Sequence, residues 1–224
     1  MALVTAIQAV VFDFDGVLAD SEPVHLKAYQ KIFEPHGIHI DQKTYCDRYL
    51  GYDDEGSIRQ MVTDNSLLMG DEEIEVLLRE KARIFEKMVA SGDMLYRGAA
   101  ACAKRLGGQW PLGIASGALR HEIELMLRGA QLLDAFRFIV SAGDTDRTKP
   151  APDPYLRAAE LHGVPPAQCV AIEDSHWGLQ SAHDAGMRTI AISHTYPRDT
   201  LEADRVVDSL DELTVDLVRG LPAR

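Results

Sequence analysis

Short apolar runs alternate with helical segments throughout the chain after residue 92. Short runs rich in Val and Ile are typical of buried strands, and parallel strands need crossovers that helices usually supply. This alternation predicts a doubly wound parallel sheet with helices on both faces. We expect strands at 111–116, 136–142, 169–174 and 188–193, and helices at 99–106, from about 119, at 154–162 and at 178–185.

The segment from Ala6 to Phe14 predicts a further strand, because it is rich in Val and apolar on both faces, as central parallel strands are. It has no basic flank and runs directly into acidic residues, so we do not interpret it as a signal peptide. Residues 21–92 differ in character: no comparable β-branched run occurs there. One segment instead places apolar side chains on a single helical face, at Ile74, Leu77, Leu78, Ala82, Phe85 and Val89.

The fold class expected from these patterns is α/β, with a Rossmann-like doubly wound parallel sheet and an inserted α-helical cap domain. The core would comprise residues 1–20 and 93–224, and the cap residues 21–92. With 46% apolar and 26% charged residues, the chain has the composition of an ordinary globular protein. We expect a monomer or a weak dimer.

Charge and cysteine usage restrict the partners and the compartment. The formal net charge of −12 argues against nucleic acid and anionic lipid as partners, which need clustered Lys and Arg. No apolar stretch approaches the roughly 18 residues of a membrane helix. Cys46, Cys102 and Cys169 are widely spaced without a CxxC motif, which favours free thiols in a reducing compartment. We therefore expect a cytoplasmic protein.

Polar residues gather at the predicted strand ends, where ligands bind in doubly wound sheets. These residues are Asp13, Asp15, Ser116, Gly117, Glu173 and Asp174, with Lys149 in the loop after the strand at 136–142. Carboxylate oxygens suit Mg²⁺, and no Cys/His cluster suits zinc. We expect Asp13, Glu173 and Asp174 to form the metal site.

This set of residues suits phosphoryl transfer. Asp13 could attack phosphorus as a nucleophile, and Asp15, after which Gly16 lets the loop turn, could act as general acid and base. Lys149 and the Ser116 hydroxyl would stabilise the phosphoryl oxygens. Taken singly, each residue also has a structural interpretation: a solvated loop for the two acids, a surface position for Lys149 and a helix cap for Ser116.

Four motifs in order give a resemblance to a known family: DFDGV at 13–17, IASG around Ser116, TKPAPDPY around Lys149, and AIEDS at 171–175. The chain resembles the haloacid dehalogenase superfamily, in the branch with a helical cap after the first strand. The resemblance implies that Asp13 is the nucleophile and Asp15 the acid/base, that Ser116 and Lys149 bind phosphate, and that Asp174 with Glu173 holds Mg²⁺. It also implies that the backbone carbonyl of Asp15 binds the metal.

Within that superfamily the chain looks similar to sugar phosphatases and beta-phosphoglucomutase. In DSEPVH, Ser21 and His25 stand where that branch has a hydroxyl residue and a histidine near the hinge. We expect His25, Gly117 and Arg120 to contact the substrate. The alternatives are an exposed helical histidine for His25 and a solvated arginine for Arg120.

One departure from the mutase pattern separates the two activities. The mutases carry an arginine in the cap that holds a second phosphate, whereas this chain has Asp53, Asp54 and Glu55 at that turn. An acid cannot clamp a phosphate, so we predict a Mg²⁺-dependent hydrolase that acts on a small phosphorylated metabolite, such as a sugar or polyol phosphate, through an aspartyl-phosphate. Arg48 or Arg59 could still reach the substrate, which keeps a phosphosugar mutase as the alternative.

Two further activities fit the residues less well. A non-catalytic sugar-phosphate-binding protein would have no chemical need for both Asp13 and Asp15. Dehalogenase activity is disfavoured by the resemblance itself, because the dehalogenases lack the second aspartate and the metal.

Overall fold

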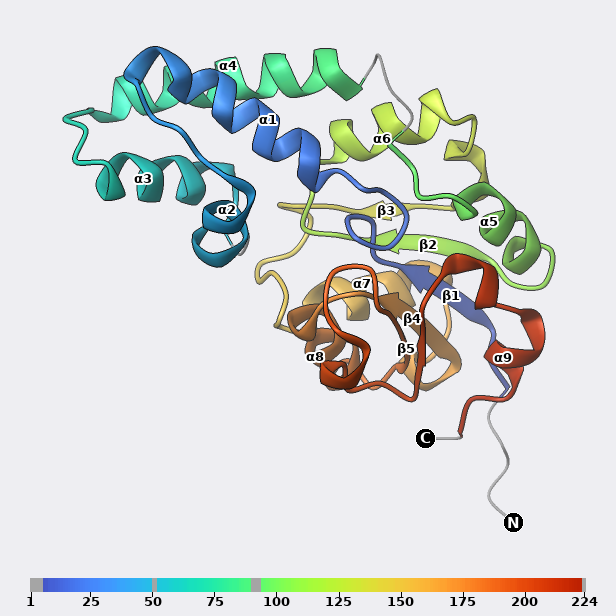
Figure 1. Ribbon diagram of the computed structural model, residues 1–224. Helices are drawn as coiled ribbons and strands as arrows, with labels where there is room; N and C mark the ends of the chain where they lie inside the picture. Colours follow the sequence, from blue (N-terminus) through green and yellow to red (C-terminus); the bar gives the residue numbers. More distant parts are fainter. Residues whose placement is uncertain (1–5, 50–51, 90–93, 223–224) are drawn as a thin grey trace. The chain divides into compact units, whose positions relative to one another are not determined.

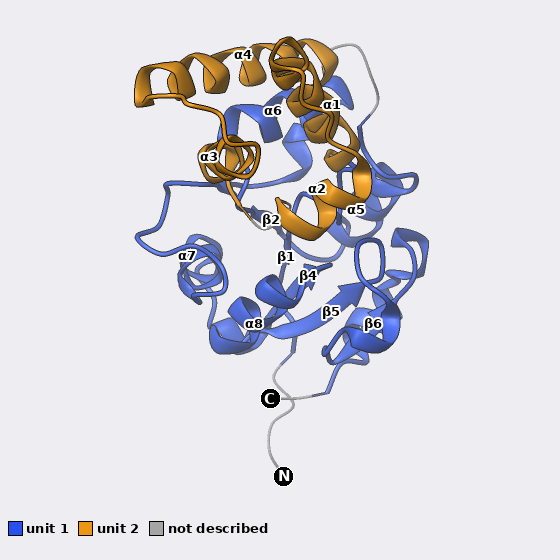
Figure 2. Ribbon diagram, turned by 60° about the vertical axis from the view of Figure 1, so that its left-hand side comes forward, with its two compact units in different colours: residues 1–20, 93–224 blue, residues 21–92 orange. Residues whose placement is uncertain are grey.

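The computed structural model describes residues 6–49, 52–89 and 94–222 (Figure 1). The chain separates into two compact units, which Figure 2 shows in different colours. We call residues 1–20 and 93–224 the sheet unit, and residues 21–92 the helical unit. The expected boundary at residues 92 and 93 lies outside the described residues. The roles of catalytic core and cap stay predictions.

The sheet unit is built on a six-stranded, all-parallel sheet with the order β3-β2-β1-β4-β5-β6. Its strands are β1 (Ala9–Phe12), β2 (Leu112–Ala115), β3 (Ile139–Val140), β4 (Cys169–Glu173), β5 (Arg188–Ile192) and β6 (Arg205–Val207). The predicted fold class is confirmed. The structure differs from the prediction in a much shorter β3 and in β6, an edge strand too short and too exposed to give a clear sequence pattern.

Helices cover both faces of this sheet. They are α5 (Ala99–Gly107), α6 (Arg120–Gly129), α7 (Asp153–His162), α8 (His176–Asp184) and α9 (Val215–Arg219). α7 and α8 pack on the face to which Ala9, Val11 and Ala171 point, because alternate residues of a strand share a face. α5 and α6 lie across the sheet from α7 and α8 (Figure 1).

The helical unit contains α1 (Glu22–Phe33), α2 (Gln42–Arg48), α3 (Asp54–Asp64) and α4 (Asp71–Val89). It has its own apolar core, which includes Phe33, Ile58 and Met61. The amphipathic pattern of α4 was predicted, but its buried side also contains Lys81, which is fully buried. The sequence pattern did not predict a buried lysine here, because a charged residue is seldom fully buried unless it is paired, and its partner cannot be read from the pattern.

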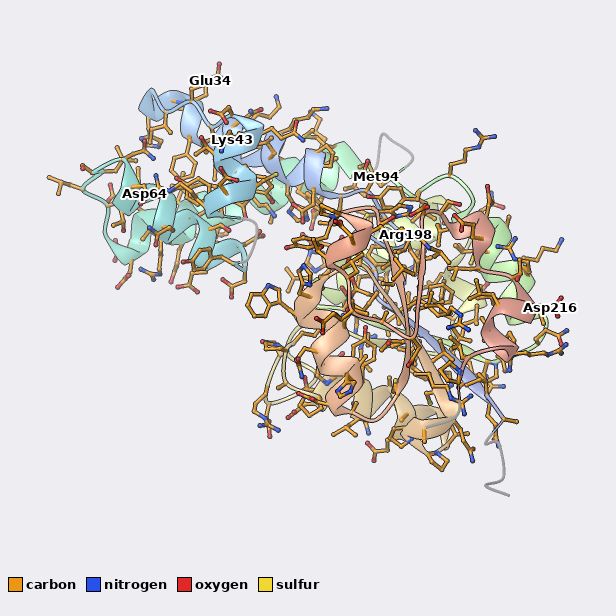
Figure 3. All side chains as sticks on the ribbon, turned by 60° about the horizontal axis from the view of Figure 1, so that its bottom comes forward. Glu34, Lys43, Asp64, Met94, Arg198 and Asp216 are labelled. Carbon is orange, nitrogen blue, oxygen red and sulfur yellow. The ribbon has the colours of Figure 1, made fainter. Side chains whose placement is uncertain are left out.

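The chain leaves and re-enters the sheet unit through two adjacent segments. Asp20 N donates to Met94 O at 2.8 Å, and Ala19 forms an antiparallel bridge with Leu95. Met94, labelled in Figure 3, is the first described residue of the returning segment. Among the described residues, no helix combines the length and the apolar character needed to cross a membrane.

Candidate active site

The candidate site lies where the order of the strands reverses. The chain runs from β1 outward to β2 and β3, and then returns to place β4 on the other side of β1. Asp13 N donates to Ile172 O at 2.8 Å, so the residue after β1 stands beside the end of β4. Such a switch point, at the carboxyl ends of the strands, is where doubly wound sheets bind ligands.

Three buried carboxylates meet at this point. Asp13, Glu173 and Asp174 each offer an oxygen, and these oxygens all lie within 4.8 Å of one another. Lys149 Nζ lies 2.6 Å from Asp13 Oδ1 and 2.6 Å from Glu173 Oε1. The structure thus brings together four of the residues that the sequence singled out, from β1, β4 and the loop before α7.

One ammonium group does not balance three buried carboxylates. Burial raises the pKa of Asp13 to about 7; Lys149 opposes this shift, and Glu173 adds to it. Burial, with Glu173 and Asp13, also raises the pKa of Asp174 to about 8. Burial by itself would lower the pKa of Lys149, but Asp13 and Glu173 outweigh it and raise the pKa above its ordinary value. A further cation at this point would favour the charged forms of Asp13 and Asp174 at neutral pH.

Glu173 is held by five hydrogen bonds and is fully buried. Its Oε1 accepts from Lys149 and from the Tyr155 hydroxyl at 2.9 Å. Its Oε2 accepts from Asp174 N, Ser175 N and Ser175 Oγ. Ser175 also caps α8 by accepting from Gly178 N. Both oxygens of Glu173 are therefore engaged within the protein.

The loop after β1, which contains Asp15, passes close to Asp174 at Gly16. Gly16 has φ +76°, and Gly16 N donates to Ala19 O at 2.8 Å, which closes the tight turn expected after Asp15. Asp174 Oδ2 accepts a short hydrogen bond from Thr195 Oγ1. The Asp15 side chain is not part of the three-carboxylate group among the described residues.

Ser116 and Gly117 follow β2 at the same edge of the sheet. Ser116 is buried, and its Oγ accepts from Ala118 N at 3.1 Å. The N-cap position of α6 is Leu119, so Ser116 stabilises a turn rather than capping this helix. A Cβ added to Gly117 would meet nothing within 4 Å, so open space adjoins this backbone.

Arg120 and His25 have other partners. Arg120 donates to Ile139 O at 2.6 Å and to Asp144 Oδ2 at 2.7 Å, and Asp144 is also held by Ser141. His25 belongs to the helical unit, where its Nδ1 lies 2.8 Å from Lys81 Nζ. Arg120 is not part of the three-carboxylate group among the described residues, and the contact of Arg120 and His25 with substrate stays a prediction.

The carboxylate group fits the hard cation that the sequence predicted. All the available ligand atoms are oxygens, the group is buried, and three carboxylates there face the single ammonium group of Lys149. Mg²⁺ prefers such ligands and typically binds through one or two carboxylates together with water and substrate oxygens. Asp13 and Asp174 would hold it, with Glu173 adjoining.

Sequence reasoning missed Tyr155 and Thr195. Tyr155 lies within the TKPAPDPY motif but was given no role, although a tyrosine on a buried helix face needs a partner for its hydroxyl. Thr195 follows β5, whose carboxyl end lies at the same edge as those of β1 and β4. Collecting the polar residues after every strand would have found Thr195.

The fold is a parallel doubly wound sheet, and buried carboxylates and a lysine lie at its switch point, where α/β proteins of this kind bind their ligands. The model of the haloacid dehalogenase-like hydrolases matches residues 10–192, and the chain belongs to that family. The resemblance and the prediction of an enzyme of this family are therefore confirmed.

Relatives over nearly the full length carry two kinds of name. The chain is 33% identical to hexitol phosphatase B of Escherichia coli, over 96% of this chain and 97% of the relative. It is 29% identical to beta-phosphoglucomutase of Bacillus subtilis, over 94% and 93%. The crystal structure of CbbY from Rhodobacter sphaeroides in complex with phosphate is similar, with 28% identity, a TM-score of 0.81, and coverage of 92% and 96%.

Proposed function

We propose that this protein is a Mg²⁺-dependent phosphatase that hydrolyses a small phosphomonoester, of a sugar or a polyol, through an aspartyl-phosphate. The observation that carries the proposal is the position of Asp13, 2.6 Å from Lys149 and grouped with Glu173 and Asp174 at the switch point. Relatives named as phosphatases support the substrate class.

The reaction would proceed in two displacements. A carboxylate oxygen of Asp13 attacks phosphorus, and the bond from phosphorus to the ester oxygen breaks while Asp15 gives its proton to the departing alkoxide. Asp15 then takes a proton from water, whose oxygen attacks phosphorus. The bond from Asp13 to phosphorus breaks, and inorganic phosphate leaves.

The other residues would bind and orient the phosphoryl group. Lys149 supplies positive charge beside Asp13, and Ser116 supplies a hydroxyl from the neighbouring strand end. Mg²⁺, when bound, neutralises charge on the phosphoryl oxygens and on the carboxylates that face them. This neutralisation would keep Asp13 ionised and therefore nucleophilic at neutral pH.

Contacts within the helical unit favour a phosphatase over a mutase. Asp53 caps α3 by accepting from Gly56 N, and Asp54 pairs with Lys81 at 2.7 Å. Arg48 pairs with Asp64, which Figure 3 labels at the end of α3. Arg59 pairs with Glu55 and Asp71.

Arg48 and Arg59, the two arginines that left a mutase as the alternative activity, are thus each paired with acidic side chains. A mutase needs a second site for phosphate, and the turn at residues 53–55, where the mutases carry an arginine, offers carboxylates that are each engaged within the helical unit. A cytoplasmic location and a monomer or weak dimer stay predictions.

Phosphate release from a panel of sugar and polyol phosphates, with and without Mg²⁺, tests the proposal. We expect turnover that requires Mg²⁺, and Asp13→Asn should lower kcat by about a thousandfold or more, because the amide cannot act as the nucleophile. Asp216→Asn, at an exposed acid of α9 (Figure 3), is the matched control and should behave like the unchanged protein.

Three results would count against the proposal. Full metal-dependent activity in Asp13→Asn would remove the nucleophile. Isomerised sugar phosphate formed only with a bisphosphate primer would indicate the mutase. Binding of sugar phosphate without any turnover would indicate a non-catalytic binding protein.

A further inference from the structure

Tyr155 is a fully buried tyrosine whose ring packs in an apolar cluster. The cluster includes Val140, Ala158 and Ala171, and the Tyr155 side chain points into it from the first turn of α7. A phenylalanine would fill the same space. A hydroxyl buried in such surroundings is unfavourable unless it is hydrogen-bonded, so the partner of the Tyr155 hydroxyl is informative.

That partner is a carboxylate of the candidate site. The Tyr155 hydroxyl donates to Glu173 Oε1 at 2.9 Å, and the same oxygen accepts from Lys149 at 2.6 Å. Lys149 Nζ also lies 4.9 Å from the centre of the Tyr155 ring, within range of a cation–π contact. Tyr155 therefore contacts both members of the ion pair that adjoins Asp13.

The Glu173 carboxylate also packs closely against the backbone of α8. A Cβ added to Gly178 in α8 would lie only 1.7 Å from Glu173 Oε1, so the carboxylate packs directly against this helix. The second oxygen, Oε2, is held by Asp174 N and by Ser175. With α8 on one side and Tyr155 donating to Oε1, the Glu173 carboxylate is held in one orientation.

We propose that Tyr155 is a positioning residue for the reaction: its hydroxyl fixes Oε1 of Glu173 where this oxygen directs the Lys149 ammonium toward Asp13. The inference rests on the proposed function, in which Lys149 stabilises the phosphoryl oxygens. Tyr155 acts through Glu173 and Lys149 and does not itself need to contact substrate.

Tyr155→Phe tests this role because it removes one hydroxyl and keeps the ring. We expect kcat to fall about tenfold with KM within about twofold, and the Mg²⁺ dissociation constant, measured by calorimetry without substrate, to rise about tenfold. Loss of a hydrogen bond that orients a metal-site carboxylate typically has effects of this size. Tyr49→Phe is the matched control, since the Tyr49 hydroxyl donates at 3.0 Å to Asp64 in the helical unit.

A crystal structure of Tyr155→Phe provides a readout that depends neither on turnover nor on metal. We expect the Glu173 carboxylate to turn and its contact with Lys149 to lengthen from 2.6 Å beyond hydrogen-bonding distance. Thermal unfolding should be nearly the same for both tyrosine variants, which separates positioning from general destabilisation.

The inference is overturned if Tyr155→Phe keeps the contacts of Lys149 with Asp13 and Glu173 in the crystal, or if its kcat and Mg²⁺ affinity equal those of Tyr49→Phe. If the unchanged protein releases phosphate from no substrate, the proposed function fails by itself. The crystal structure of Tyr155→Phe then still decides whether Tyr155 positions Glu173 and Lys149.

Discussion

Gly16 lies where the loop after β1 passes the Asp174 carboxylate. Its φ of +76° favours glycine, and a Cβ there would lie 1.9 Å from Asp174 Oδ2 and 2.8 Å from Thr195 Oγ1. Glycine is thus required for two separate reasons, the backbone conformation and the close approach of a carboxylate. Gly37 shares only the first reason: its φ is +72°, and a Cβ there would meet nothing within 4 Å.

Substitution by alanine should therefore have different outcomes at Gly16 and at Gly37. Gly37→Ala should cost about 1 kcal/mol of unfolding free energy and leave Mg²⁺ binding and phosphate release unchanged. Gly16→Ala should cost at least as much and also weaken Mg²⁺ binding about tenfold or more, since Asp174 must move. Urea unfolding and calorimetry measure the two quantities. Equal Mg²⁺ affinities in both variants would contradict the close fit between Gly16 and Asp174.

At the scale of elements, α1, α3 and α4 meet around a buried lysine. Lys81 of α4 donates to both oxygens of Asp54 at 2.7 Å and approaches His25 Nδ1 at 2.8 Å. An ammonium group has no acceptor, so Nδ1 of His25 must accept and its proton is on Nε2. Burial, with the charge of Lys81, lowers the pKa of His25 to about 3. His25 therefore stays neutral in the folded helical unit.

A neutral, partly buried histidine predicts that stability falls in acid. The unfolded chain binds a proton on His25 below about pH 6.5, whereas the folded chain resists protonation down to about pH 3. The unfolding free energy should therefore drop as the pH falls through this window, with His25 contributing about 1–2 kcal/mol between pH 7 and pH 5.

The substitution His25→Asn separates the contribution of His25 to the pH dependence of stability from the contributions of other titrating groups. His25→Asn offers an oxygen acceptor to Lys81 but does not titrate, so its stability should depend less on pH. His39→Asn, at an exposed histidine of the same unit, is the control. Urea unfolding at several pH values measures the effect, and parallel pH curves for both variants would rule out the proposed contribution of His25.

At the scale of the whole molecule, the helical unit is inserted between the first strand and the rest of the sheet unit. β1, supplied by the first 20 residues, is flanked by β2 and β4 and is thus central to the sheet. The hydrogen bond from Asp20 N to Met94 O brings the two ends of the insertion close together. The sheet unit can therefore be closed by a short linker.

We predict that replacing residues 21–92 by a short Gly/Ser linker leaves a folded sheet unit that binds Mg²⁺. Each candidate site residue except His25 belongs to this unit. The shortened protein should unfold cooperatively and should discriminate less among phosphomonoesters, as expected if the helical unit selects the substrate. Circular dichroism and calorimetry test the first expectation, and the substrate panel tests the second. A folded sheet unit unable to bind Mg²⁺ would show that the helical unit supplies part of the metal site.

The sequence by itself determined the sheet and the grouping of its polar residues. Apolar runs set the strands, and parallel crossovers place the carboxyl ends of all strands at one edge, so the amino-acid order alone is enough to group Asp13, Lys149, Glu173 and Asp174. The edge strand β6 was not predicted, because it has only three residues, one exposed, one half-buried and one buried, and so short a run gives no clear pattern.

Only the tertiary structure decided how side chains are paired. Lys81 is buried because Asp54, 27 residues away, neutralises it, and Arg120 is engaged by Asp144 rather than left free. Tyr155 meets Glu173 across 18 residues. Local periodicity encodes which face a residue occupies, but pairing depends on distances between elements that no short segment specifies. For that physical reason, the location of the candidate site could be predicted from the amino-acid sequence, whereas the contacts among its side chains became known only from the tertiary structure.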